Sequence, residues 1–139
     1  MIAVHVFKTA LINLLQADAA VVALASNRIY DEAPEDQRGV ADVASPYAYL
    51  GPIHATRLES DGVPGWTLRL RLYAASTSFG RSEAWSLMDA ICAAIDGKIL
   101  ILPAPYVHAQ QSYVASGGDV IDALNPKLVY VDLSAIVAG

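Results

Sequence analysis

The fold of this chain is decided by residues 66–74, WTLRLRLYA. The apolar side chains in this stretch fall on every second residue, which is the period of a strand with one buried and one exposed face. The alternation predicts that the three leucines point into the core and that Arg69 and Arg71 point outward. We therefore expect a central strand with one covered face.

A helical period follows the polar joint at residues 75–78. Apolar side chains then recur at three- and four-residue spacing, which is typical of an amphipathic helix over residues 80–95. Gly97 is expected to end this helix, because glycine adopts a left-handed conformation at little steric cost. A one-faced strand followed by a one-faced helix predicts a helix that lies across a sheet.

Similar patterns predict the remaining elements. An apolar stripe indicates an N-terminal helix over residues 4–17, and Asp18 is well placed to cap a short second helix over residues 19–24. Residues 98–102 are expected to form an edge strand or an extended connection, and residues 116–119 to turn the chain. The expected extended segments are 28–30, 47–53, 66–74, 106–114 and 127–137.

The order of these elements predicts an α+β fold. We expect a largely antiparallel sheet, in which strands 47–53 and 66–74 pair through a polar loop at 56–65, with the N-terminal and central helices packed on one face. The chain has 139 residues, the usual size of one domain, so a single domain over residues 1–139 is expected.

The composition restricts the possible partners. The chain is 55% hydrophobic and 17% charged, but no apolar run approaches the roughly 20 residues of a membrane span, so we expect no membrane association. The surplus of apolar residues favours cover by partner subunits. A net charge of −5, with no cluster of Lys or Arg, argues against a dedicated DNA-binding role. The N-terminus lacks a signal-peptide pattern and the single Cys excludes an internal disulfide, which predicts assembly in a reducing cytoplasm.

The polar residues form no recognisable catalytic or metal-binding motif. His5, His54 and His108 fall on different predicted elements without metal-site spacing, and we expect His108 to be a half-exposed residue of the sheet. Cys92 lies on the apolar helix stripe, where burial should raise the pKa of its thiol. We therefore predict no catalytic residues, metal or cofactor, and no enzyme activity.

Arg69 and Arg71 leave two interpretations open. In one, they belong to a solvated sheet face with cross-strand ion pairs. In the other, this face meets the acidic loop at residues 31–36 of a neighbouring copy and gives a head-to-tail contact that closes into a ring.

The assembled segments resemble a known family. The most specific parts are RIYD at residues 28–31 with AP at 33–34, and PY at 46–47 with LG at 50–51. Together with the flanking helices, they resemble the tail completion or tail terminator proteins of long-tailed bacteriophages and of gene transfer agents. The resemblance covers almost the whole chain.

This resemblance implies a structural virion protein. It implies a homo-hexameric ring on the head-proximal end of the tail tube, which ends tube polymerisation, contacts the tail tube protein and the head-tail connector or stopper protein, and lets DNA pass without specific binding. The competing interpretation is a monomeric or dimeric adaptor or chaperone-like module of the cytoplasm. As subunit or tube contacts we expect Tyr30, Asp31, Glu32, Pro34, Glu35, Asp36, Arg69 and Arg71.

Overall fold

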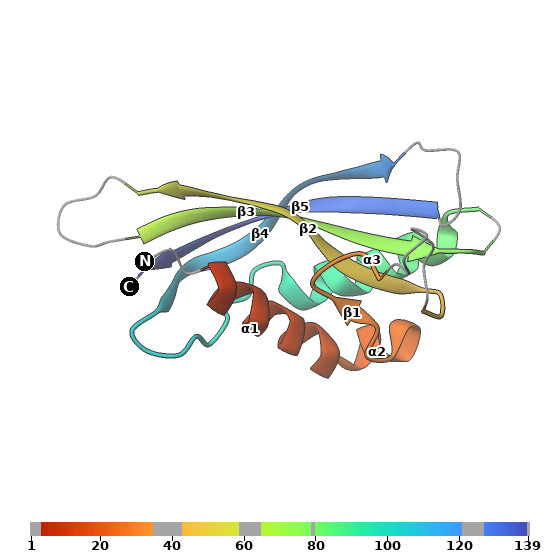
Figure 1. The fold of residues 1–139 in the computed structure, drawn as a ribbon, viewed down its shortest axis with the longest axis horizontal. Coiled ribbons are helices and arrows are strands. Elements are labelled where there is room, and N and C mark those ends of the chain that lie inside the picture. The colour runs from red at the N-terminus through yellow and green to blue at the C-terminus, as the bar shows by residue number, and fades with distance from the viewer. Residues whose placement is uncertain (1–3, 35–42, 59–64, 79, 121–126, 139) are drawn as a thin grey trace.

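The computed structural model describes residues 4–34, 43–58, 65–78, 80–120 and 127–138. Within these ranges the chain forms three helices and five strands, shown in Figure 1. In chain order they are α1 (Val4–Ala17), α2 (Ala19–Ala25), β1 (Ile29–Tyr30), β2 (Tyr47–Arg57), β3 (Gly65–Ser76), α3 (Ser82–Ile95), β4 (Val107–Val120) and β5 (Lys127–Ala138).

The five strands form one sheet in the order β1-β2-β3-β5-β4. The short strand β1 runs parallel to β2, and all the other neighbours are antiparallel. The predicted pairing of residues 47–53 with residues 66–74 is confirmed, with Tyr49 opposite Tyr73. The predicted α+β class with a largely antiparallel sheet is confirmed as well.

The alternation in β3 sorts its side chains as predicted. Leu68, Leu70 and Leu72 are each 1% exposed, whereas Arg69 is exposed and Arg71 is partly exposed. The leucines join one apolar cluster with buried side chains of all three helices and of β5. In Figure 1 the helices gather below the sheet. We call the face of the sheet that carries Arg69 and Arg71 the outer face.

Helix α3 supplies much of the core. Its buried side chains recur at helical spacing and contact β3, β5 and α2. Gly97 follows the helix with φ +73°, so the predicted left-handed C-terminal residue is confirmed. Cys92 is half-buried on this helix, and burial raises the pKa of its thiol, as predicted, with a smaller contribution from Asp89 and Asp96.

Asp18 separates α1 from α2. Its carboxylate accepts hydrogen bonds from the backbone N–H groups of Ala20 and Val21, both at 3.1 Å, so the predicted N-cap is confirmed. The two helices meet at a bend of 80°. Among the described helices, none alone has the length and hydropathy of a membrane span, and only this bent pair reaches them when taken together.

Strand β4 is longer than the sequence pattern predicted. It runs to Val120, so the turn expected at residues 116–119 is wrong. The two glycines that suggested a turn lie instead opposite β5, where a Cβ at Gly117 would come within 3.0 Å of the carbonyl oxygen of Tyr130. A Cβ at Gly118 would meet the ring of Tyr130 at 3.4 Å. These glycines therefore allow close packing within the sheet and do not reverse the chain.

His108 is also placed differently from our expectation. It is 3% exposed, not half-exposed, because the segment between α3 and β4 folds back over it. Residues 98–102 form the extended connection that was one of the two expected alternatives. This connection lies against β4, where Ser112 donates its backbone N–H to the carbonyl oxygen of Lys98 at 2.9 Å.

Candidate functional site

A row of tyrosines crosses the outer face. Tyr49 of β2, Tyr73 of β3 and Tyr130 of β5 are paired across neighbouring strands. The rings of Tyr49 and Tyr73 stack with centroids 5.0 Å apart at an angle of 24°. Tyr73 also lies over Gly51, where the pairing of β2 with β3 shifts register. The missing side chain at Gly51 thus makes room for the tyrosine row.

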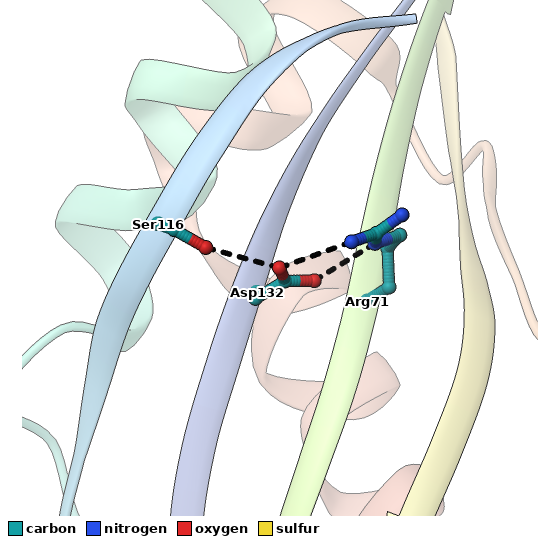
Figure 2. A network of polar contacts seen from close by, with 3 residues as sticks. All are labelled: Arg71, Ser116 and Asp132. Carbon is teal, nitrogen blue, oxygen red and sulfur yellow. Dashed lines mark hydrogen bonds and ion pairs between the residues drawn. The ribbon is translucent and has the colours of Figure 1, made fainter.

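An ion pair lies beside this row, on β3 and β5. The guanidinium of Arg71 donates from Nε and Nη2 to the two carboxylate oxygens of Asp132, at 2.8 and 3.2 Å. Ser116 of β4 donates its hydroxyl to the same carboxylate at 3.0 Å, so the network in Figure 2 joins three strands. Arg71 also sits 4.1 Å from the ring centroid of Tyr130, a cation–π distance.

The electrostatics of this network follow from its hydrogen bonds. The bond from Arg71, followed by the weaker one from Ser116, holds the pKa of Asp132 below its ordinary value of 3.8, against an opposing effect of burial. The same bond to Asp132 raises the pKa of Arg71. Both groups are therefore charged at neutral pH, and Arg71 has its charge satisfied within the chain. This geometry corresponds to the cross-strand ion pair of our first interpretation.

A groove of about 540 Å³ runs along the outer face beside the ion pair. Arg69 lies in it with an exposed side chain and has no ion pair with any described residue, and Tyr113 on β4 is 55% exposed. Neither side chain has a hydrogen bond or ion pair with another described residue, so both can contact a partner without breaking one. The groove is lined by Pro52, Arg69, Leu70, Arg71, Tyr113, Ala115, Ser116, Asp132, Leu133 and Ser134.

The predicted acidic loop lies at another place. Asp31 forms an ion pair with Lys8 of α1 at 2.6 Å, while Glu32 is exposed and Pro34 is half-buried. Glu35 and Asp36 lie outside the described residues. Within one chain the structure therefore does not bring this loop to Arg69, since β2 separates β1 from β3.

Tyr30 connects to the outer face through other aromatic rings. The centroids of the Tyr30 and Tyr47 rings are 6.5 Å apart. The Tyr47 ring in turn stacks on Tyr49 of the tyrosine row, with centroids 6.2 Å apart. Sequence reasoning named Tyr30 but missed Tyr49, Tyr130 and Asp132. The signal for Asp132 was its place between buried Val131 and Leu133, since alternation turns such a residue outward.

This surface is suited to binding. It combines aromatic rings, an arginine available to a partner and a shallow groove, the side chains that are enriched at protein contacts. The described residues contain no group of three or more His, Cys, Asp or Glu that could hold a metal ion. The fold and surface thus define a small α+β protein with an exposed sheet face that carries a groove, aromatic rings and an arginine.

Comparison with known proteins gives the family. The model of the tail completion protein gp17 family matches residues 9–138. The chain belongs to this family and is a structural tail protein of a virion. The family is one of structural proteins and not of enzymes. The resemblance stated from the sequence is thereby confirmed.

A solved structure shares the fold. A chain in the structure "Virion of native gene transfer agent (GTA) particle" superposes with a TM-score of 0.83 at 19% identity, over 99% of this chain and 98% of that chain. At this identity the similarity shows the fold alone. No curated protein matches the sequence.

Proposed function

We propose that the protein forms a hexameric ring on the head-proximal end of a tail tube. The ring ends tube polymerisation and joins the tail to the connector or stopper protein of the head. The observation that carries this proposal is the family match over residues 9–138, since it covers nearly every element of the fold. The shared fold with a chain of a gene transfer agent particle supports it.

The mechanism of termination is geometric. One surface of the ring matches the last ring of the tube, and the opposite surface withholds what a further tube subunit needs, so addition stops. DNA passes through the bore without specific binding. The net charge of −5 supports this passage, because weak or repulsive walls do not hold phosphate groups.

Contacts between subunits or with the tube involve the outer face and the segment after β1. Arg69 is the strongest candidate, since it is exposed and unpaired among the described residues. Arg71 and Asp31 already form ion pairs within the chain, so they contribute mainly by holding the shape of the contact surface around them. The whole contact set that we propose is Tyr30, Asp31, Glu32, Pro34, Glu35, Asp36, Arg69 and Arg71.

The same proposal gives the location of the protein. It is assembled in the cytoplasm of the host bacterium as one domain over residues 1–139 and becomes part of the virion at the head-proximal end of the tail. Its partners are five further copies, the tail tube protein and the head connector.

The test is the solution mass by light scattering over a concentration series, with and without purified tail tubes. A mass near six times the 14.7 kDa of the chain supports the ring directly. A monomer that forms a six-fold cap only on added tubes, seen by negative-stain microscopy, supports termination with assembly on the tube end. A monomer that leaves tubes uncapped and still growing contradicts the proposal and favours the adaptor module.

A further inference from the structure

The connection between α3 and β4 buries apolar side chains on one face and exposes apolar side chains on the other. In residues 99–102, Leu100 is 7% exposed and Leu102 is half-buried, while Ile99 is 56% and Ile101 is 95% exposed. An extended segment with apolar side chains on both faces is typical of segments buried on both faces. Here the described chain covers only one face.

This connection is held in place by the chain itself. The backbone N–H of Leu100 donates to Nδ1 of His108 at 2.7 Å, and the carbonyl oxygen of Lys98 accepts from Ser112 at 2.9 Å. Ile99 and Ile101 therefore project from an anchored backbone. A segment whose backbone is already fixed loses less conformational entropy when a partner covers its side chains.

A groove lies beside Ile101. It has a volume of about 330 Å³ and separates the connection from α1. None of its lining residues is an Asp, Glu, Lys or Arg, so it favours an apolar side chain as its occupant. We call it the α1 groove; it is lined by His5, Val6, Thr9, Ala10, Asn13, Ile101 and Pro103.

The same chain carries an apolar projection of matching chemistry. On α2, Val22 is 40% and Leu24 is 38% exposed, and Ala23 between them is exposed as well. The 80° bend after α1 turns this short helix away from the axis of α1. Figure 1 shows α2 and the connection between α3 and β4 at opposite ends of the group of helices.

We infer that the α2 projection of one copy docks into the α1 groove of the next copy. A projection and a groove at opposite ends of one chain give a head-to-tail contact, which is the kind that closes into rings. The flanking charges are opposite in sign: exposed Lys98 precedes Ile101 by three residues in the chain, and Asp18 immediately precedes α2. This inference rests on the proposed ring and adds a contact between neighbouring subunits to those proposed above.

The test is cross-linking of single-cysteine variants under the conditions in which rings form, with tubes present if assembly needs them. In a Cys92→Ser background, Leu24→Cys and Ile101→Cys are prepared separately and mixed, and a short bis-maleimide is added. We expect a covalent dimer in the mixture and little in either variant alone. The double variant should give a ladder that ends at the hexamer.

A matched control uses an exposed position on the sheet. Thr56→Cys on β2, mixed with Ile101→Cys, should give no dimer. If that pair cross-links as well as Leu24→Cys with Ile101→Cys, or if Ile101→Cys alone dimerises as efficiently, the head-to-tail contact is overturned.

A second variant measures assembly itself. Ile101→Asp should leave the melting temperature unchanged, because the side chain is 95% exposed, and should raise the concentration needed for ring formation about tenfold or more. If rings form but Leu24→Cys and Ile101→Cys do not cross-link, this contact is overturned and the proposed function stays intact. The same holds if the Ile101→Asp variant forms rings at the wild-type concentration. Wild-type protein that neither forms rings nor caps tubes contradicts the proposed function instead.

Discussion

Leu100 donates its backbone N–H to Nδ1 of His108 over 2.7 Å, inside a core where the histidine is 3% exposed. Nδ1 can accept this bond only while it carries no proton. The other ring nitrogen lies 3.2 Å from the hydroxyl of Ser112, and the histidine and Phe7 rings pack edge to face with their centroids 5.7 Å apart. Burial lowers the pKa of His108 below its ordinary 6.5, so the histidine is neutral at neutral pH.

Acidification should therefore destabilise the fold. The unfolded chain takes up a proton on His108 near pH 6.5, while the folded chain resists it down to a lower pKa. Stability is fully present above pH 6.5 and falls as the pH decreases toward the folded-state pKa, by up to about 1.4 kcal/mol per pH unit for this one group. Urea unfolding between pH 5 and pH 8 measures the slope.

The control is His108→Asn, whose side-chain oxygen can accept the Leu100 bond without titrating. This variant should be less stable above pH 6.5, since it loses the contact with Phe7, but its stability should depend less on pH between pH 5 and 6.5. An equal slope in the variant and in the wild type would show that His108 does not cause the acid sensitivity.

His108 also shows where sequence reasoning stops. Alternation in residues 66–74 predicted the buried and exposed sides of β3 correctly, because period two in a strand maps directly onto its two faces. The burial of His108 depends on the connection of residues 98–106, whose path is set by contacts distant in sequence and by no local period. The helix, the connection and β4 come together only through tertiary packing, so no local pattern in the sequence predicts that His108 is buried.

The candidate surface divides in the same way. The outward direction of Arg69 and Arg71 followed from the local pattern, and both lie on the outer face as predicted. The ion-pair partner of Arg71 could not be predicted from the local pattern. Asp132 is 61 residues away in the chain, and only the register of β3 with β5 brings it opposite Arg71. Register depends on which buried faces pack together, which one strand alone does not specify.

Gly51 gives a prediction about the tyrosine row. A Cβ at this position would lie 2.5 Å from Cε2 of Tyr73 and 3.1 Å from the carbonyl oxygen of Arg71. Gly51→Ala should therefore lower the free energy of unfolding by about 1–3 kcal/mol, the usual cost of overpacking. Chemical denaturation measures it.

The Tyr73 ring is the matched partner in this test. Replacing Tyr73 with Leu removes the atom that clashes, so Gly51→Ala should cost less in the Tyr73→Leu background than in the wild type. The relief should be partial, since the carbonyl oxygen of Arg71 remains. Equal costs in both backgrounds would mean that the ring does not require glycine at position 51.

Cys92 should react slowly with thiol reagents. It is half-buried on α3, and burial first, then the nearby Asp89 and Asp96, raises the pKa of its thiol, so the reactive thiolate is scarce at pH 8. Reaction with an aromatic disulfide reagent should be slower than for free cysteine and should accelerate in denaturant. Rapid reaction in the native state would contradict the described burial.

The two outward arginines should separate stability from assembly. Arg69→Ala removes an exposed side chain without a described ion-pair partner, so the melting temperature should stay unchanged while ring formation or tube capping weakens. Arg71→Ala leaves Asp132 with only the Ser116 bond and should lower the melting temperature. Thermal unfolding and light scattering on the same samples measure both effects.

Acid titration gives an independent check on Arg71. The lowered pKa of Asp132 stabilises the fold above its ordinary value of 3.8, and this contribution is lost as the pH falls through the folded-state pKa. Arg71→Ala should weaken that acid dependence. Arg69→Ala should preserve it, because the guanidinium of Arg69 makes no bond to Asp132.

The assembly role of Arg69 has its own contradicting outcome. If Arg69→Ala left rings and tube capping unchanged at micromolar concentration, Arg69 would not belong to the subunit or tube interface. Its exposed charge would then be only part of the solvated face of the sheet.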